Sequence, residues 1–262
     1  SLYGEKDFKN LKYMDGAIEV SGLGNFDNNE LSKALAGKQC GVSFGANLYS
    51  QSVSGSSTPK DLETMMQLLY LYFTNIKKDT TSYNTMIASL KMKLKNKDLA
   101  PESVFGDSVS VTISGHQKRF APSDIKDLDV INYDRMLEIG RQMLSNAGAF
   151  TFTFLGNFDE AKLRPLIEQY IASLPGDSKK AKTYKQMDMY VKGEVANHFT
   201  RKMETPKCIA LEMWTAKMPY SLENAVLAGV AGDVLSMEYL KQIREEASAA
   251  YSVSANGSLS RN

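Results

Sequence analysis

Hydrophobic residues in this chain follow two different periods, and segments of the two kinds alternate along the sequence. They recur at every second position around Val42 to Leu48 and again from Phe150 to Phe154. In other stretches they recur at helical spacing, as from Leu62 to Phe73. The first period is typical of a half-buried strand and the second of an amphipathic helix. A chain of 262 residues with this pattern is long enough to bury a core, so we expect an α+β fold.

The first 176 residues contain the elements of one nearly complete domain (1–176). A strand is expected from Val42 through Tyr49 toward Val53, followed by a turn over Ser54–Ser57. Thr58 then favours the start of a helix that is buried nearly all round, because threonine caps helices and Pro59 is preset for the first turn. The other predicted elements are a helix over 82–96, a helix after Asn132, a strand over Phe150–Leu155 and a helix over Leu163–Leu174.

A second, smaller unit is expected after a linker. We expect this linker over 177–190, because Asp177–Gln186 is polar, rich in lysine and without periodicity. Residues 191–262 then predict a strand over Cys208–Trp214, a helix from about Ser221 to Ser248 and a strand from Tyr251 to Ala255. One helix and two strands bury little apolar surface alone, so we expect 191–262 to be part of a truncated second α+β domain. The chain also begins with Ser1 rather than Met, which predicts a piece of a longer polypeptide.

Charge and residue counts exclude several classes of function. The chain has 31 lysines and arginines against 30 acidic residues, a net charge of +1 that provides no field for binding nucleic acid. No apolar run reaches the roughly 18 residues of a membrane span, and no signal peptide is recognisable. His116 and His198 lie far apart and without further ligands at metal spacing, so we do not expect this chain to form a zinc site alone. Cys40 and Cys208 are expected to be free thiols, and the compartment stays open.

Three motifs in order carry a resemblance to a known family. The stretch from Gly22 to Phe73 includes Gly24-Asn25-Phe26, Leu35-Ala36-Gly37-Lys38 and the run from Gly55 to Glu63. It closely resembles the second half of large bacterial zinc peptidases of the insulinase/pitrilysin family. The segment FTFLGNFDEAKLRPLIEQYIASLP (152–175) resembles the strand, turn and helix that close domains of that family. The run YLKQIREEASAAYSVSA (239–255) is similar to its Arg-Glu-Glu…Tyr-Ser-Val signature.

The resemblance implies a fold and a place in a larger enzyme. It implies a sandwich of antiparallel sheet and helices, with homologous domains in two halves that enclose a peptide. The family's zinc motif, H-x-x-E-H, is not present in this sequence. The zinc of the complete enzyme would therefore be bound by the other half, on the same chain or on a partner subunit, and this segment would need no cofactor of its own. The resemblance also implies an opening strand before Ser1 and a final domain that continues past Asn262.

The signature places two candidate substrate-binding residues in this chain, Arg244 and Tyr251. By resemblance they would face the metal-bound peptide, where a tyrosine hydroxyl or a guanidinium can donate to the developing oxyanion. Structural roles are the alternative. Arg244 near a helix C-terminus is favoured by the helix dipole and could pair with Glu245 or Glu246, and Tyr251 could simply pack in a strand. Ala249 and Ala250 stand where many relatives carry a glycine.

Two hypotheses about function follow from these residues. In the first, the chain is the C-terminal, substrate-clamping half of a zinc-dependent metalloendopeptidase that acts on peptides or unfolded protein segments. In the second, it is a catalytically inactive module of the same family that binds a peptide or a partner subunit. An H-x-x-E-H motif elsewhere in the complete polypeptide would favour the first. Neither hypothesis predicts a nucleic-acid partner or a membrane span.

Overall fold

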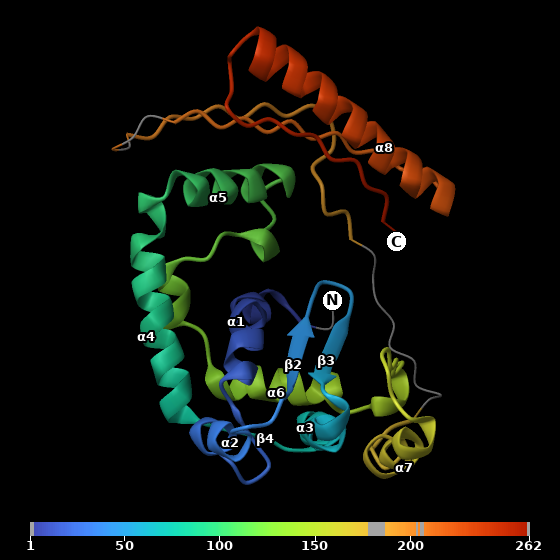
Figure 1. Ribbon diagram of the computed structural model, residues 1–262. Coiled ribbons are helices and arrows are strands. Elements are labelled where there is room, and N and C mark those ends of the chain that lie inside the picture. The colour runs from blue at the N-terminus through green and yellow to red at the C-terminus, as the bar shows by residue number, and fades with distance from the viewer. Residues whose placement is uncertain (1–2, 178–186, 203, 205–206, 261–262) are drawn as a thin grey trace. The chain divides into compact units, whose positions relative to one another are not determined.

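The computed structural model describes residues 3–177, 187–202, 204 and 207–260. The chain divides into two compact units, Ser1–Lys207 and Cys208–Asn262, each of which is considered by itself (Figure 1). Most of the predicted linker, 178–186, lies outside the described residues, so the predicted boundaries at 176 and 191 stay predictions. None of the described helices is long and apolar enough to cross a membrane.

The first unit is mainly helical. Its α-helices are α1 (Phe8–Glu19), α2 (Asn28–Ala34), α3 (Leu62–Thr74), α4 (Thr80–Asn96), α5 (Pro101–Ile113), α6 (Tyr133–Leu144) and α7 (Glu160–Tyr170). Short 3₁₀ turns join them: η1 (Glu5–Asp7), η2 (Pro59–Asp61), η3 (Lys97–Leu99), η4 (Lys118–Phe120), η5 (Ile125–Asp129) and η6 (Ala147–Ala149). The predicted helices at 62–73, 82–96, after 132 and 163–174 are confirmed.

Several helices begin next to a side chain that accepts a hydrogen bond from one of the first backbone N–H groups, which have no acceptor within the helix. Asn132 caps α6 as predicted, with its side-chain oxygen 2.9 Å from the backbone nitrogen of Arg135. Thr58 behaves differently. It stands before Pro59, but its hydroxyl donates to the Asp61 carboxylate at 3.1 Å and does not cap the helix.

The sheets of the first unit are small and antiparallel. β2 (Cys40–Ala46) pairs with β3 (Gln51–Ser57) in a hairpin that lies next to α1 and α3 (Figure 1). β1 (Gly22–Leu23) pairs with β4 (Ile76–Lys77). The predicted single strand from Val42 toward Val53 was wrong, and so was the turn over Ser54–Ser57. The chain turns at 47–50 instead, where the Asn47 side chain accepts from the backbone N–H groups of Tyr49 and Ser50.

The core of the first unit joins α1, α3 and α6. Its fully buried side chains are Met14, Ile18, Met66, Met136, Leu137, Ile139 and Leu144. Gly140 permits the close approach of α6 to α1, because a Cβ there would lie 2.4 Å from Cδ1 of Ile18. α3 is buried on most sides, as its continuous apolar sequence predicted.

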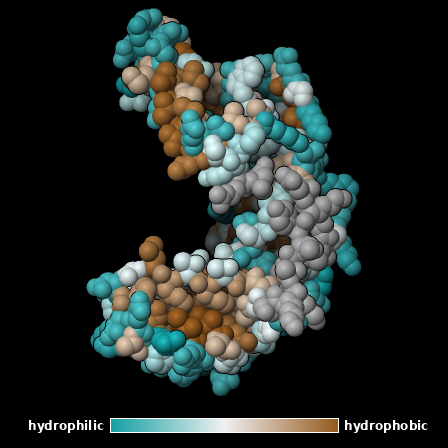
Figure 2. Space-filling view, turned by 90° about the vertical axis from the view of Figure 1, so that its right-hand side faces the viewer, coloured by the Kyte–Doolittle hydropathy of each residue, from teal (hydrophilic) through white to brown (hydrophobic). Residues whose placement is uncertain are grey.

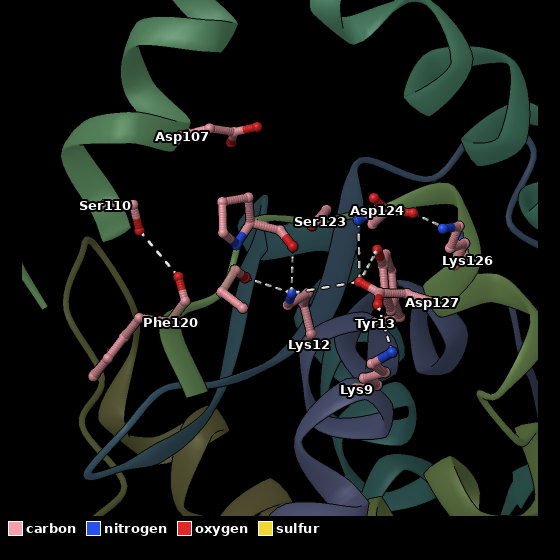
Figure 3. A network of polar contacts seen from close by, with 12 residues as sticks. Lys9, Lys12, Tyr13, Asp107, Ser110, Phe120, Ser123, Asp124, Lys126 and Asp127 are labelled. Atoms are coloured by element: carbon pink, nitrogen blue, oxygen red, sulfur yellow. Dashed lines mark hydrogen bonds and ion pairs between the residues drawn. The ribbon is translucent and has the colours of Figure 1, made fainter. Parts of the chain in front are cut away.

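The buried carboxylate of Asp127 in η5 bonds to side chains of α1 (Figure 3). Asp127 accepts from Lys9 at 3.0 Å, from the Tyr13 hydroxyl at 3.2 Å and from the backbone nitrogen of Asp124 at 3.1 Å. Its side chain is only 6% exposed. Burial opposes ionisation, but the Asp124 N–H and the Lys9 ammonium outweigh it, so the pKa of Asp127 lies below its usual value.

The second unit consists of one long helix and extended chain. Ser221 caps α8 (Leu222–Tyr239), and its hydroxyl oxygen lies 3.0 Å from the backbone nitrogen of Asn224. The helix continues as a π-helical stretch, η7 (Leu240–Glu246), so the predicted helix to about Ser248 is confirmed. Figure 2 shows hydrophobic surface in the upper part of the view, where α8 lies. Its exposed apolar side chains include Val226, Leu227, Val230, Val234 and Met237.

Three predicted strands are not paired in the structure. Phe150–Leu155, Cys208–Trp214 and Tyr251–Ala255 form no strand among the described residues. Burial still alternates along residues 151–154: Phe152 and Phe154 are partly buried, whereas Thr151 and Thr153 are exposed. A strand requires a ladder with a neighbouring strand as well as the right period, and the described residues supply no such neighbour. The fold class α+β is nevertheless confirmed.

Candidate functional site

Arg244 lies on the π-helical stretch that follows α8. In η7 the hydrogen bonds reach back further than in an α-helix: the Ala247 nitrogen bonds the Gln242 oxygen at 3.0 Å. A π-helical turn is wider than an α-helical one and shifts the side chains that follow it. No residue pattern predicts this irregularity, because each of the residues from Leu240 to Glu246 suits an ordinary α-helix.

A sharp reversal then returns the chain toward Arg244. Ser248 adopts a positive φ of 48°, and the Ala249 nitrogen bonds the Ile243 oxygen at 2.9 Å. A left-handed residue directly after a helix is a common way to end it, although serine adopts this conformation less readily than glycine. The small residues Ala249 and Ala250 lead from the reversal to Tyr251.

The reversal brings the two predicted site residues together. The guanidinium carbon of Arg244 lies 5.3 Å from the centroid of the Tyr251 ring, a cation–π distance. Tyr251 is 88% exposed, so its hydroxyl is open to solvent. Arg244 is also exposed, and within the described part of the chain it forms no ion pair, including none with Glu245 or Glu246.

The chain beyond Tyr251 is held against α8. The Ser236 hydroxyl bonds both the backbone nitrogen and the backbone oxygen of Ala255, each at 2.8 Å. Gly232 and Gly257 allow the backbones to touch, because a Cβ on Gly232 would lie 2.4 Å from the Gly257 nitrogen. Helix α8 therefore positions both ends of the segment that carries the pair: Arg244 at its continuation and residues 255–257 along its side.

The pair can donate hydrogen bonds but supplies no base. A guanidinium offers N–H donors in a rigid fork, and a phenol offers one O–H. The arrangement suits recognition of carbonyl or carboxylate oxygens in an extended ligand. It does not provide the nucleophile and general base that would make a hydrolytic centre on its own.

A zinc ion does not fit the described residues. They contain no group of three or more histidine, cysteine, aspartate or glutamate side chains that could hold a metal. His116 follows α5 with a positive φ of 60°, and His198 lies in the irregular segment before Lys207. Both cysteines are free thiols as expected; burial, followed by the charge of Asp61, raises the pKa of the Cys40 thiol.

Fold and sequence together define a non-catalytic domain of a zinc-protease family. A family profile described as "Peptidase M16 inactive domain" matches residues 131–262, which is half of the chain and contains both Arg244 and Tyr251. The chain belongs to this family, the insulinase-type peptidases, and represents its non-zinc-binding half.

Similar proteins include plant and bacterial members. The chain is 24% identical over 174 residues to the "Zinc protease PQQL-like" of Arabidopsis thaliana, an overlap of 66% of this chain and 18% of that protein. It resembles the periplasmic protease PqqL of Escherichia coli with a TM-score of 0.68 and 19% identity, over 96% of this chain and 28% of that one. It also resembles a mutant of the ferredoxin protease FusC, solved in complex with Arabidopsis ferredoxin. The TM-score is 0.53 and the identity 17%, over 68% of this chain and 19% of that one. The chain thus spans less than a third of each of these relatives.

Proposed function

We propose that this chain is the C-terminal, substrate-clamping half of a zinc-dependent metalloendopeptidase that acts on peptides or unfolded protein segments. In this proposal another part of the complete polypeptide, or a partner subunit, supplies the zinc motif. The chain belongs to the inactive-domain family of zinc proteases and has no residues that fit a zinc ion in its described part, which supports this division of labour.

One observation carries the proposal. Arg244 and Tyr251, which match the family's signature, stack at 5.3 Å on an exposed reversal of the chain. The reversal pre-positions two donors on neighbouring backbone, and stacking on the ring restricts the guanidinium while its N–H groups stay accessible. Donors that are already in position when the substrate binds need little rearrangement as negative charge develops on the peptide carbonyl oxygen.

In this proposal each residue of the pair donates hydrogen bonds to a different part of the substrate. Arg244 binds backbone carbonyls or carboxylates of the substrate through its fork. The Tyr251 hydroxyl donates to the oxygen on which negative charge develops. A donor of that kind is typically worth about 2.7 to 4 kcal/mol of transition-state stabilisation.

The experiment replaces Arg244 in the complete, zinc-loaded polypeptide. Arg244→Ala should lower kcat/KM at least about tenfold, with part of the loss in KM because the guanidinium also binds the ground state. Zinc content should not change, because Arg244 is not a ligand. Lys241→Ala is the matched control, since it removes a cation one helical turn away and should leave kcat/KM unchanged. Equal kinetics for both variants would contradict the proposal.

A second function has one observation in its favour. The described residues lack a metal group, and family members of this kind could serve as inactive modules that bind a peptide or partner subunit. If the complete polypeptide contains no H-x-x-E-H motif and does not hydrolyse an unfolded protein in the presence of zinc, this second function replaces the first.

A further inference from the structure

The chain around Tyr251 forms a span that is fixed only at its two ends. Within the described part of the chain, the backbone of residues 250–254 makes no hydrogen bond. On one side of this span, the Ala249 nitrogen bonds the Ile243 oxygen at 2.9 Å. On the other side, the next backbone that is bonded belongs to Ala255. The position of Tyr251 therefore depends on two anchors, one at each end of the span.

The second anchor is made by a side chain of α8. The Ser236 hydroxyl accepts from the Ala255 nitrogen and donates to the Ala255 oxygen, each at 2.8 Å. A hydroxyl has one donor and two acceptor positions, so a single serine can satisfy both backbone groups of one residue. In a sheet, these two groups of Ala255 would bond to a neighbouring strand. Ser236 takes the place of that neighbour at one point of the chain.

This use of a helical serine is unusual. Serine within a helix commonly donates to the carbonyl four residues earlier. Ser32 in α2 does so, with its hydroxyl oxygen 2.9 Å from the Asn28 oxygen. The Ser236 hydroxyl instead uses its donor for Ala255, a residue 19 positions away in sequence. The hydroxyl therefore serves the segment after Tyr251 rather than its own helix.

The Ser236 bonds also set the register of the segment along α8 (Figure 1). Val253, Ala255 and Gly257 are partly buried, whereas Ser254 is exposed, so alternate residues of the extended chain face the helix. Contacts between small apolar groups hold two segments together, but they are non-directional and permit sliding. Hydrogen bonds have a preferred direction. Among the described residues, the two Ser236 bonds are the only hydrogen bonds between residues 250–259 and α8.

The contact of Tyr251 with Arg244 does not fix the tyrosine by itself. It joins two exposed side chains, and Tyr251 is 88% exposed, so little packing restricts its ring. A donor that stabilises a transition state must nevertheless be placed closely, because a displacement of about 1 Å can cost on the order of a hundredfold in rate. The position of the tyrosine therefore has to come from the backbone anchors.

We propose that Ser236 is a positioning residue for Tyr251. Its two bonds to Ala255 hold the far end of the span and so keep the Tyr251 hydroxyl where a substrate oxygen can accept from it. This inference rests on the proposed function, because Ser236 acts through the Tyr251 hydroxyl. The Ser236 hydroxyl itself does not contact the substrate, since its donor is already taken by Ala255.

Steady-state kinetics of Ser236→Ala in the complete, zinc-loaded polypeptide tests this role. The turnover number kcat should fall roughly fivefold to fiftyfold, with KM changed by less than about twofold, because the misplaced donor acts in the transition state. Ser32→Ala is the control, since it removes a hydroxyl that bonds only within α2, and it should leave both constants unchanged. A purely structural role of Ser236 would lower the melting temperature and leave kcat of the folded enzyme unchanged, which would overturn the proposal.

A double-mutant cycle with Tyr251→Phe shows whether Ser236 acts through the tyrosine hydroxyl. If it does, the double variant Ser236→Ala/Tyr251→Phe should have a kcat/KM within about twofold of Tyr251→Phe alone, because the hydroxyl to be positioned is already absent. Losses that multiply in the double variant would show that Ser236 acts independently of the Tyr251 hydroxyl, and the proposal would be wrong.

Hydrogen exchange of the complete polypeptide provides a readout that does not depend on activity. The Ala255 amide should exchange at least about tenfold faster in Ser236→Ala, because it loses its acceptor. Amides of α8 before Ser236 should exchange at the same rate in both forms. An unchanged rate at Ala255 would mean that Ser236 does not anchor the segment, which would also overturn the proposal.

The kinetics separate a failure of this inference from a failure of the proposed function. If Tyr251→Phe lowers kcat/KM and Ser236→Ala does not, the function stands and the positioning role is wrong. If Tyr251→Phe leaves kcat/KM unchanged, the proposed function is wrong, and the positioning role is wrong with it.

Discussion

At the scale of single residues, we expect the buried Asp127 carboxylate to contribute to the pH dependence of the first unit's stability. Asp127 is ionised, nearly buried and held by Lys9, Tyr13 and a backbone N–H. Because its pKa is lowered in the folded state, its contribution to stability is present above the ordinary aspartate pKa of about 3.9 and is lost as pH falls through the lowered value.

Asp127→Asn should therefore reduce the free energy of unfolding by about 1 to 3 kcal/mol at pH 7, because the amide keeps only one acceptor oxygen, loses the charge and places an NH2 donor against buried donors. The difference from the unchanged chain should shrink as pH falls below the ordinary aspartate pKa of about 3.9, because the unfolded carboxyl group is protonated first and the folded one at a lower pH. Melting curves at pH 7 and over a series of lower pH values measure it. Asp134→Asn is the control: that side chain is 71% exposed and should change stability by no more than about 0.5 kcal/mol. A difference for Asp127→Asn that is constant with pH would contradict the assigned network.

At the scale of elements, the sequence predicted helices better than strands. Helix α6 follows from its N-cap Asn132 and from the apolar period of the helix, both of which are local in sequence. The segment Phe150–Leu155 has the period of a strand, but a ladder also requires a partner distant in sequence, which no local pattern specifies and which the described residues do not supply. The hairpin turn was missed because Asn47 and Ser50 were read as part of the strand, although the Asn47 side chain provides the turn.

The approach of α8 to residues 255–257 depends on Gly232. Gly232→Ala should weaken the second unit, because its Cβ would overlap the Gly257 backbone, which cannot move aside as a flexible side chain can. Gly229→Ala on the same helix has no heavy atom within 4 Å of its Cβ and should be neutral or stabilising by up to about 1 kcal/mol. Hydrogen exchange of residues 253–257 distinguishes the two variants: it should be faster in Gly232→Ala than in Gly229→Ala. Equally slow exchange in both variants would show that the contact between Gly232 and Gly257 does not hold this segment against α8.

At the scale of the whole molecule, the candidate site was predictable only in part. The signature singled out Arg244 and Tyr251 as site residues, but it predicted neither their contact with each other nor the π-helical stretch and the left-handed Ser248 that bring them together. Sequence also predicted that metal chemistry lies elsewhere, and this can be measured. The 262-residue chain should retain less than about 0.1 zinc per chain after dialysis, because a site needs three or four ligands assembled together. Near-stoichiometric zinc that is lost in His116→Ala or His198→Ala would contradict this expectation.

Steady-state kinetics of Tyr251→Phe in the complete, zinc-loaded polypeptide would measure whether the Tyr251 hydroxyl stabilises the transition state. The substitution removes one hydroxyl and keeps the ring on which Arg244 stacks, so folding and zinc content should be unchanged. If the hydroxyl donates to the developing oxyanion, kcat/KM should fall roughly tenfold to a thousandfold, equivalent to about 1.4 to 4 kcal/mol. Tyr190→Phe, the same change in the first unit, should leave kcat/KM unaltered. Unchanged kcat/KM in folded, zinc-loaded Tyr251→Phe would show that the hydroxyl has no such role.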